Sequence, residues 1–284
     1  MYRRDQLIET IRAYGRVAVA FSGGIDSTVV AQAAFEAVGD RAIAVTAVSE
    51  SFAEGELEEA VGLARRIGIK HRVVRTEEFS NPNYRRNNPD RCYFCKNELY
   101  GRLKAMLPEL GADVITSGAN ADDMGDYRPG LKAAAEHGVR HPLQECGLSK
   151  AEVRALALAW DLPTWDKPAT PCLSSRIAYG EEATPERNRM IDQAEQWLRG
   201  RGFHILRVRY HKGDLARIEV PIDELPRFVE LELCGELVPA FRGLGFKFVT
   251  LDLEGFRSGS LNDIIPAEVL MRGVGRATTP AVRS

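Results

Sequence analysis

The sequence lacks the features of a membrane or exported protein. No apolar run reaches the length of about 18 residues that a membrane helix needs, and residues 1–5 do not begin a signal peptide. A large excess of one charge is also missing, because the formal net charge is only −2. A near-neutral chain argues against a permanently basic surface for nucleic acid. We therefore expect a cytoplasmic protein with no membrane partner and no stable nucleic-acid partner.

Cysteine is scarce, and its pattern argues against two kinds of site. The five cysteines are an odd number in a chain without an export signal, so a disulfide framework is not expected. The single C-x-x-C pair, Cys92 and Cys95, has no second pair to complete a structural zinc site with four cysteine ligands. Some thiols are therefore expected to be reduced and free for metal binding or catalysis. Cys146 and Cys234 have no partner spacing, and we interpret them as structural.

Two common nucleotide-binding fingerprints are also absent, namely Gly-x-x-x-x-Gly-Lys-Ser/Thr and Gly-x-Gly-x-x-Gly. Instead, a buried strand at 17–21 leads into the turn Ser22-Gly23-Gly24-Ile25-Asp26-Ser27 and then into a helix. The glycines allow the backbone to approach an anion, at which the turn amides and the positive helix end then point. Ser22 and Ser27 add hydroxyl donors, and Asp26 can hold Mg²⁺ against phosphates. The pattern predicts a phosphate-binding loop, and the alternative is a tight turn without a ligand.

Strands alternate with helices through residues 1–180, which predicts parallel βαβ units and a doubly wound α/β sheet. The expected strands are 17–21, 41–48, 70–75, 112–116 and 139–143, and the expected helices are 5–14, 26–38, 54–67, 95–107, 131–136 and one that Ser149 caps. The segment 76–91 is rich in Asn and Pro and is expected to be a loop. Ligands gather at the carboxyl ends of such strands, so the turns 22–27, 49–52 and 117–123 should lie near one another. In the last turn, Gly118, Asp122 and Asp123 are candidates for ATP binding. The two aspartates either serve Mg²⁺ or cap the next helix.

A second region, residues 181–272, has the pattern of a small α+β domain for substrate binding or oligomerisation. The expected elements are a helix at 185–199, strands at 204–210, 215–220 and 246–252, and helical stretches around 223–233 and 236–244. Residues 273–284 are short and polar, and we expect a flexible tail.

Three of the cysteines form a candidate metal constellation. Cys92 and Cys95 lie on a predicted loop that enters a helix near Cys95, and Cys172 lies on a predicted loop at the ligand edge of the sheet. Three thiolates beside a nucleotide suit three irons of a [4Fe–4S] cluster, which leaves the fourth iron open for a ligand such as sulfide. The alternatives are a buried dithiol, a zinc site completed by His141, or a reversible disulfide.

Basic residues flank these cysteines and recur on a later strand. Lys96 and Arg176 lie next to the cysteine segments, where they either bind a substrate carboxylate and lower a thiol pKa or are solvated surface charges. Arg207 and Arg209 fall on one face of a predicted strand, and two adjacent guanidinium groups favour a substrate phosphate. Glu195 is a candidate for their acidic partner or a substrate contact. A solvated strand face is the alternative.

The turn 22–27 matches the Ser-Gly-Gly-x-Asp-Ser loop at every fixed position, so the chain resembles the PP-loop ATP pyrophosphatases. These enzymes cleave ATP between the α- and β-phosphates and adenylate a substrate oxygen. Further segments resemble the LarE-type ATP-dependent sulfur transferases, namely 92–96, 118–123, 126–130, 171–177 and 207–219. This second resemblance covers nearly the whole chain.

The resemblance implies an enzyme that uses ATP and Mg²⁺ to adenylate a carboxylate of a nicotinate-derived pyridinium mononucleotide. Sulfur then replaces an oxygen, on the path to the nickel-pincer cofactor. In some members a cysteine that matches Cys172 gives up its own sulfur, whereas members with three cysteines are implied to carry a [4Fe–4S] cluster that receives sulfide from a sulfur donor. Because this chain has all three cysteines, we expect the cluster type. A homo-oligomer is expected as well. The open alternatives are tRNA thiolation, amidation with ammonia, and a non-enzymatic iron–sulfur or nucleotide sensor.

Overall fold

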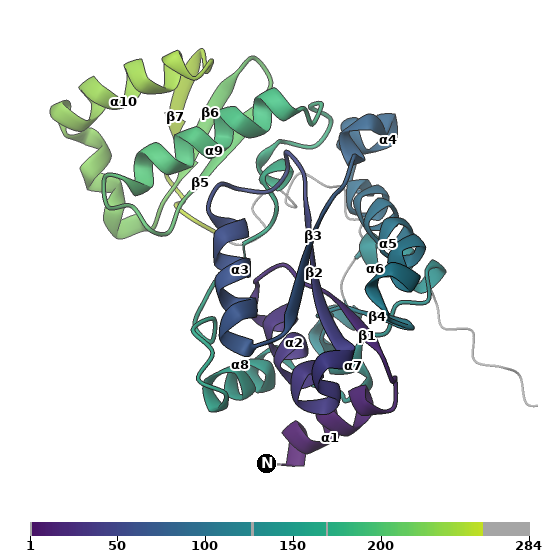
Figure 1. Ribbon diagram of the computed structural model, residues 1–284. Coiled ribbons are helices and arrows are strands. Elements are labelled where there is room, and N and C mark those ends of the chain that lie inside the picture. The colour runs from purple at the N-terminus through teal and green to yellow at the C-terminus, as the bar shows by residue number, and fades with distance from the viewer. Residues whose placement is uncertain (1, 126–127, 169, 258–284) are drawn as a thin grey trace, which may run out of the picture.

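The computed structural model describes residues 2–125, 128–168 and 170–257, and it has a larger α/β part and a smaller α+β part (Figure 1). This arrangement agrees with the predicted fold class. The expected tail at 273–284 lies outside the described residues, as does the end of the predicted second domain. Within the described ranges, no helix combines the length and the apolar character of a membrane span.

The larger part is built on a parallel sheet in the order β3-β2-β1-β4. Its strands are β1 (Val17–Ala20), β2 (Ala42–Val48), β3 (Lys70–Arg75) and β4 (Val114–Thr116). Alternate residues point to opposite faces, so Val17, Val19 and Ala44 enter one core while Ala18 and Val45 enter another. The strands β1 and β4 are short and apolar because both faces of the sheet are covered there, whereas the edge strand β3 carries four basic residues and is mostly exposed.

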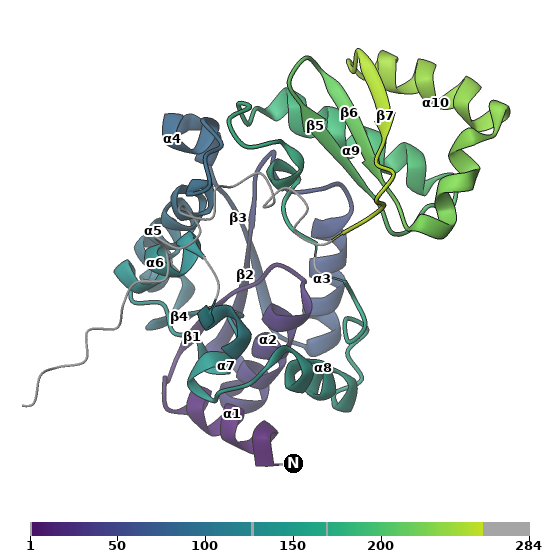
Figure 2. The same cartoon turned by 180° about the vertical axis from the view of Figure 1, so that it is seen from behind.

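Helices cover both faces of the parallel sheet, because each connection between parallel strands is a right-handed crossover that packs a helix on one face. One face carries α1 (Tyr2–Arg12), α2 (Ile25–Val38), α3 (Glu56–Ile67) and α8 (Lys150–Ala159), and the other carries α5 (Arg91–Leu110) and α6 (Pro129–Glu136) (Figures 1 and 2). The connections from β1 and from β2 cross on the first face, and the connection from β3 to β4 crosses on the second. The chain therefore changes sides next to β1, which places a ligand crevice at its carboxyl end.

Two predictions in the larger part are wrong. The expected strand at 139–143 is only an isolated bridge between Arg140 and Thr116, followed by α7 (Pro142–Glu145), because Pro142 lacks an amide proton and suits the first turn of a helix. The expected loop at 76–91 contains η2 (Glu78–Ser80) and α4 (Pro82–Arg85), and α5 begins at Arg91 rather than near Cys95. The other short elements are η1 (Gly39–Arg41), η3 (Ala121–Gly125) and η4 (Leu173–Arg176).

The smaller part contains a mixed three-stranded sheet in the order β5-β6-β7. Its elements are α9 (Pro185–Arg199), β5 (Arg207–His211), β6 (Leu215–Glu219), η5 (Ile222–Val229), α10 (Leu231–Gly243) and β7 (Phe248–Leu251). The expected helix at 223–233 is instead the 3₁₀ segment η5 followed by the start of α10, and Pro226 within η5 cannot donate a backbone hydrogen bond. One sheet face packs Val208 and Ile218 into the core, and the other carries Arg209 and Glu219.

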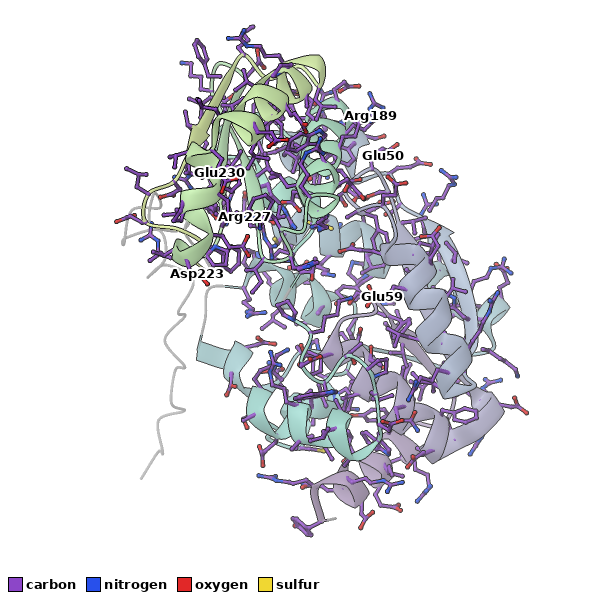
Figure 3. The ribbon with its side chains drawn as sticks, turned by 90° about the vertical axis from the view of Figure 1, so that its left-hand side faces the viewer. Glu50, Glu59, Arg189, Asp223, Arg227 and Glu230 are labelled. Atoms are coloured by element: carbon purple, nitrogen blue, oxygen red, sulfur yellow. The ribbon has the colours of Figure 1, made fainter. Side chains whose placement is uncertain are left out.

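The two parts meet at η4, where buried polar groups bind each other. Arg176 and Glu195 form an ion pair at 3.1 Å, and each side chain is only 1% exposed. The Leu173 amide donates to the Ser51 carbonyl, and the Asn188 side chain donates to the Glu50 carbonyl at 3.0 Å. Figure 3 shows Glu50 and Arg189 on the side where the loop after β2 meets α9. The junction therefore belongs to the packed interior of the molecule.

The substitution Glu195→Ala should lower the free energy of unfolding by about 3–5 kcal/mol, because it leaves the buried Arg176 guanidinium without its carboxylate. Urea unfolding followed by circular dichroism measures the change. The matched control is Glu236→Ala, which removes an exposed pair with Arg201 and should cost less than about 1 kcal/mol. Equal costs for the two variants would contradict a structural role for the buried pair.

Candidate active site

The turn after β1 closes into a compact loop at the N-terminus of α2. Gly23 has φ +71°, a conformation that favours glycine, and Gly24 is the N-cap of the helix. The Ser27 hydroxyl donates to the Gly24 carbonyl at 3.0 Å and accepts from the Ser22 amide at 3.2 Å. The loop is thus held at the positive end of a helix, which is a setting that binds phosphate.

Asp26 faces two polar partners from distant segments. The Lys150 ammonium forms an ion pair with one carboxylate oxygen, and the Asn120 side chain donates to the other at 3.2 Å. Lys150 was not among the residues predicted from sequence. Its place at the first position of α8, between the capping-box residues Ser149 and Glu152, was visible in the sequence, but nothing nearby indicates a contact with Asp26. A cation fixed beside the loop can neutralise phosphate charge.

The turn after β4 packs directly against this loop. A Cβ atom at Gly118 would lie 2.7 Å from the Ser27 nitrogen, so only glycine fits. Asp122 accepts from the Lys150 amide at 2.8 Å, so it binds the first turn of α8, whose N-cap is Ser149, and not the start of the helix that follows it directly in sequence. Asp123 accepts from the Asn120 amide and pairs with Arg128 at 2.9 Å. The predicted convergence of these two turns is confirmed, whereas a role for either aspartate in binding Mg²⁺ stays a prediction.

The loop that carries Cys172 is held by its carbonyl groups. The Ser175 hydroxyl donates to the Cys172 carbonyl at 2.6 Å, and Arg176 donates to the same oxygen at 3.1 Å. Arg91 donates to the Ser174 carbonyl at 2.6 Å. Arg176 was predicted to contact substrate or a thiol, but its guanidinium is buried against Glu195 and these carbonyls. Arg176 therefore fixes the position of the Cys172 backbone.

Cys92 and Cys95 lie on the first turns of α5 and not on the predicted loop before it. Cys92 is exposed, whereas Cys95 packs against the core that both parts share. Burial raises the pKa of Cys95 to about 12, and the adjacent Lys96 ammonium counteracts part of that rise. Negative charge on Cys172 or on Cys92 raises it further, so the three thiols are electrostatic neighbours.

The donor chemistry of these thiols suits iron–sulfur ligation, because soft thiolates are its usual ligands. In the described ranges, however, no group of three or more His, Cys, Asp or Glu side chains is close enough to hold a metal ion. His141, considered as a fourth zinc ligand, bonds through Nδ1 to the Ser117 hydroxyl at 2.7 Å. Burial lowers the pKa of His141, and its charged neighbours are Glu145 and Asp123 rather than thiols.

The predicted phosphate-binding arginines lie on β5, with acidic partners other than those expected. Arg209 pairs with Glu219 at 2.9 Å and also donates to the Ser175 carbonyl. Glu195 pairs with Arg176 and with Arg199 at 2.8 Å, rather than mainly with the strand arginines. Burial and the positive charge of Arg176 lower the pKa of Arg207 to about 10. The polar face of this sheet is therefore crowded with positive charge, which favours binding of an anion.

Comparison with known proteins agrees with this geometry. The NAD synthase family model matches residues 4–107. The uncharacterized protein slr1717 of Synechocystis sp. is 49% identical over 265 residues, which are 92% of this chain and 98% of that protein. The pyridinium-3,5-bisthiocarboxylic acid mononucleotide synthase of Lactiplantibacillus plantarum is 39% identical over 93% of this chain and 95% of that enzyme. A tRNA-specific 2-thiouridylase MnmA from Azorhizobium caulinodans is 32% identical over 57% of this chain and 51% of that enzyme.

The chain belongs to the LarE family. It is therefore an ATP-using sulfur transferase with a PP-loop domain, and both features agree with the predictions from sequence. The PP-loop of this LarE-family chain is the turn 22–27, supported by Gly118 and Lys150 from elements far away in the sequence. ATP and Mg²⁺ follow from the family.

The substitution Gly118→Ala should lower the rate of pyrophosphate release from ATP roughly a hundredfold, because a methyl group there displaces the backbone of Ser27 by a fraction of an ångström or more. A coupled pyrophosphate assay measures the rate. The control is Gly62→Ala in α3, where an added Cβ meets nothing within 4 Å. That variant should keep the wild-type rate and gain about 0.5–1 kcal/mol of stability. Unchanged pyrophosphate release in a folded Gly118→Ala variant would disprove the tight packing of the two turns.

Proposed function

We propose that this LarE-family enzyme adenylates a carboxylate of a nicotinate-derived pyridinium mononucleotide and converts it to a thiocarboxylate for nickel-pincer cofactor synthesis. The observation that carries the proposal is the position of the Cys172 loop. It bonds to the loop after β2 through Leu173 and Ser51, and to Arg209 on the basic sheet face through Ser175. The sulfur-bearing loop thus joins the ATP edge of one sheet to a candidate phosphate site on the other. The name of the relative from L. plantarum supports the substrate class.

Adenylation requires stabilisation of charge on the phosphates. A substrate carboxylate oxygen attacks the α-phosphorus of ATP, and the bond to the β-phosphate oxygen breaks with release of pyrophosphate. The amides of the loop 22–27 and the N-terminus of α2 stabilise the charge that develops, while Asp26 holds Mg²⁺ and Lys150 offsets phosphate charge. Arg207 and Arg209 bind the substrate phosphate and so orient the carboxylate.

The second step replaces AMP with sulfur. An anionic sulfur nucleophile attacks the acyl carbon of the adenylate, and AMP leaves with the former carboxylate oxygen, because the phosphate monoester is the better leaving group. Of the three thiols, Cys172 has its backbone fixed by Ser175 and Arg176 and is partly exposed. Lys96 neutralises negative charge at the sulfur site, next to Cys95.

In the first form of the proposal, Cys92, Cys95 and Cys172 would hold a [4Fe–4S] cluster, which would supply sulfide as the nucleophile. The second form is sacrificial donation by Cys172, which ends as dehydroalanine. The observation that favours this second form is that the described residues include no group of three or more His, Cys, Asp or Glu side chains placed to hold a metal ion. The division into residues 1–180 and 181–272 and a homo-oligomeric state remain predictions.

Single replacements separate the roles of the cysteines. Cys172→Ala should abolish sulfur transfer in both forms, whereas pyrophosphate release should persist because the phosphate loop is untouched. Cys234→Ala should leave both activities unchanged, because that thiol donates to the Phe228 carbonyl in the smaller part. Product formation is followed by mass spectrometry of the mononucleotide. If Cys92→Ala and Cys95→Ala keep full transfer, the cluster form is wrong and Cys172 is the donor.

Intact-protein mass spectrometry after reaction with ATP, acceptor and sulfide distinguishes the sulfur sources. Donation by Cys172 should remove about 34 Da from each chain, the mass of hydrogen sulfide, and limit product to one sulfur per chain. The cluster form predicts an unchanged polypeptide mass and several products per chain. A Cys172→Ser variant is the control, because it should show neither the mass loss nor product. Product without Cys172 would remove this residue from the reaction.

A further inference from the structure

Glu78, on η2 after β3, is a buried carboxylate without a cationic partner among the described residues. Four carboxylate residues in the described ranges are less than one tenth exposed, namely Glu78 (3%), Asp123 (8%), Glu195 (1%) and Glu219 (0%). Each of the last three pairs with an arginine at 2.9 to 3.1 Å. Glu78 instead accepts hydrogen bonds from two hydroxyl groups. A buried carboxylate of this kind is costly to keep, so its two contacts require an explanation.

Both hydroxyl groups belong to the turn that follows β2. Ser49 and Ser51 donate to the same carboxylate oxygen, Oε1, and the bond from Ser51 is 2.9 Å long. The two serine hydroxyl oxygens lie 2.9 Å from each other, and the Ser51 amide donates to the Ser49 hydroxyl at 3.1 Å. One carboxylate oxygen therefore closes the turn and fixes both serines, and it does so as a hydrogen-bond acceptor and not as a counter-charge.

The same turn holds the segment that carries Cys172. The Ser51 carbonyl accepts from the Leu173 amide at 3.0 Å, and Leu173 is the residue next to Cys172. The Glu78 carboxylate and the Leu173 amide therefore bind the same serine, one through its side chain and the other through its backbone. A change at Glu78 that releases the turn also loosens the backbone beside Cys172.

The side-chain contacts of Glu78 and the two serines are separate from the phosphate loop. Within the described ranges, no side-chain hydrogen bond of these three residues reaches residues 22–27. That loop is held instead by the turn after β4 and by the start of α8. The position of the Cys172 segment and the binding of phosphate therefore depend on different contacts, so each is open to its own test.

We propose that Glu78 is a positioning residue that sets the place of the Cys172 segment relative to the nucleotide edge of the parallel sheet. It acts through Ser49 and Ser51, as the acceptor that gives their turn its shape. The inference rests on the proposed function for its purpose, because attack of sulfur on an adenylate depends on the relative placement of the two groups. It applies to both forms of that proposal, since Cys172 has a part in each. An acceptor role requires an oxygen atom rather than a charge, so Glu78→Gln should preserve it.

Hydrogen exchange at the Leu173 amide tests the positioning without any reaction. Exchange is measured on the full-length protein by mass spectrometry with fragmentation that resolves single amides. Glu78→Leu removes the acceptor and should speed exchange at Leu173 roughly tenfold, because the amide is then released with the turn. Glu78→Gln should stay within about threefold of the wild type, since its carbonyl oxygen accepts both hydrogen bonds. The matched control is Glu77→Gln, at the exposed side chain beside Glu78, and it should change nothing.

A serine variant tests the route of the effect, and it keeps the test available if Glu78→Leu does not fold. Ser51→Ala removes one of the two donors and no charge, and it should speed exchange at Leu173 about threefold to tenfold. In this background, Glu78→Leu should add less than it does in the wild type, because residues that act through one contact are not additive.

Activity separates positioning from a general structural defect. With ATP and the mononucleotide, Glu78→Leu should keep pyrophosphate release within about threefold of the wild type, but it should lower thiocarboxylate formation roughly a hundredfold. Glu78→Gln should restore most of the thiocarboxylate formation, because the acceptor is present again. A general defect in folding would lower both steps together.

Three results would overturn the proposal. The first is unchanged exchange at Leu173 in folded Glu78→Leu or Ser51→Ala protein. The second is a Glu78→Gln variant as impaired as Glu78→Leu, which would assign the effect to charge. The third is an equal loss of pyrophosphate release and thiocarboxylate formation in Glu78→Leu.

The exchange measurement uses neither ATP nor the mononucleotide, so the positioning by Glu78 is judged independently of the proposed reaction. If exchange at Leu173 responds as expected but the wild type forms no thiocarboxylate, only the proposed function fails. If the wild type forms thiocarboxylate but exchange at Leu173 does not respond, only the role of Glu78 fails.

Discussion

The hydrogen bonds of Arg176 are the interaction on which the rest of the structure depends. This guanidinium is fully buried, pairs with Glu195, and donates to the carbonyls of Pro171 and Cys172. Backbone carbonyls in an irregular loop need donors when they are buried, and here one side chain provides them. Because Glu195 belongs to α9 and the loop also bonds to the segment after β2, the two parts cannot separate without exposing or unpairing these groups. The position of Cys172, which lies at this junction, is therefore fixed by the same contacts that join the two parts of the fold.

In the proposed reaction, two anionic ligands meet at this junction. ATP and a mononucleotide repel each other, so the proposed site needs cations on both sides. Lys150 provides positive charge at the PP-loop, and the arginines of β5 provide it at the other edge. Carboxylates accompany both groups, since Asp26 pairs with Lys150 and Glu219 pairs with Arg209. The pairs keep the cations in place in the free enzyme, and an anionic ligand replaces part of that compensation on binding.

Local pattern was sufficient for much of the fold. Glycine positions, apolar periodicity and caps located the helices at 25–38, 56–67 and 185–199 within two residues, because these signals act over a few residues of chain. The strand expected at 139–143 failed because its apolar residues suit a buried helix turn equally well once Pro142 starts it. The start of α5 was missed because Asn87, Asn88 and Pro89 suggested a longer loop.

Candidate site residues could be predicted from sequence where they belong to a motif. They could not be predicted where only the fold brings them close to the other site residues. The PP-loop and the three cysteines stand out in the sequence, but Lys150 reaches Asp26 across 124 residues, and its place at the start of α8 does not by itself indicate that contact. The same limit explains why Glu195 was assigned to Arg207 and Arg209. Strand alternation places those arginines on one face. It does not reveal that Arg209 binds Glu219 on the next strand, or that Arg176 forms the ion pair with Glu195.

The three cysteines are also unequal in a way that only the structure reveals. Cys95 is packed into the core and keeps its proton at neutral pH, since burial raises its pKa to about 12, whereas Cys92 is exposed to solvent. A metal centre at these residues must remove the proton from Cys95, so its formation costs more than binding to three solvated thiols. The Lys96 ammonium, next in sequence on α5, offsets part of that cost. The cysteine spacing alone therefore does not describe these thiols, because the packing of α5 buries one member of the C-x-x-C pair and leaves the other in solvent.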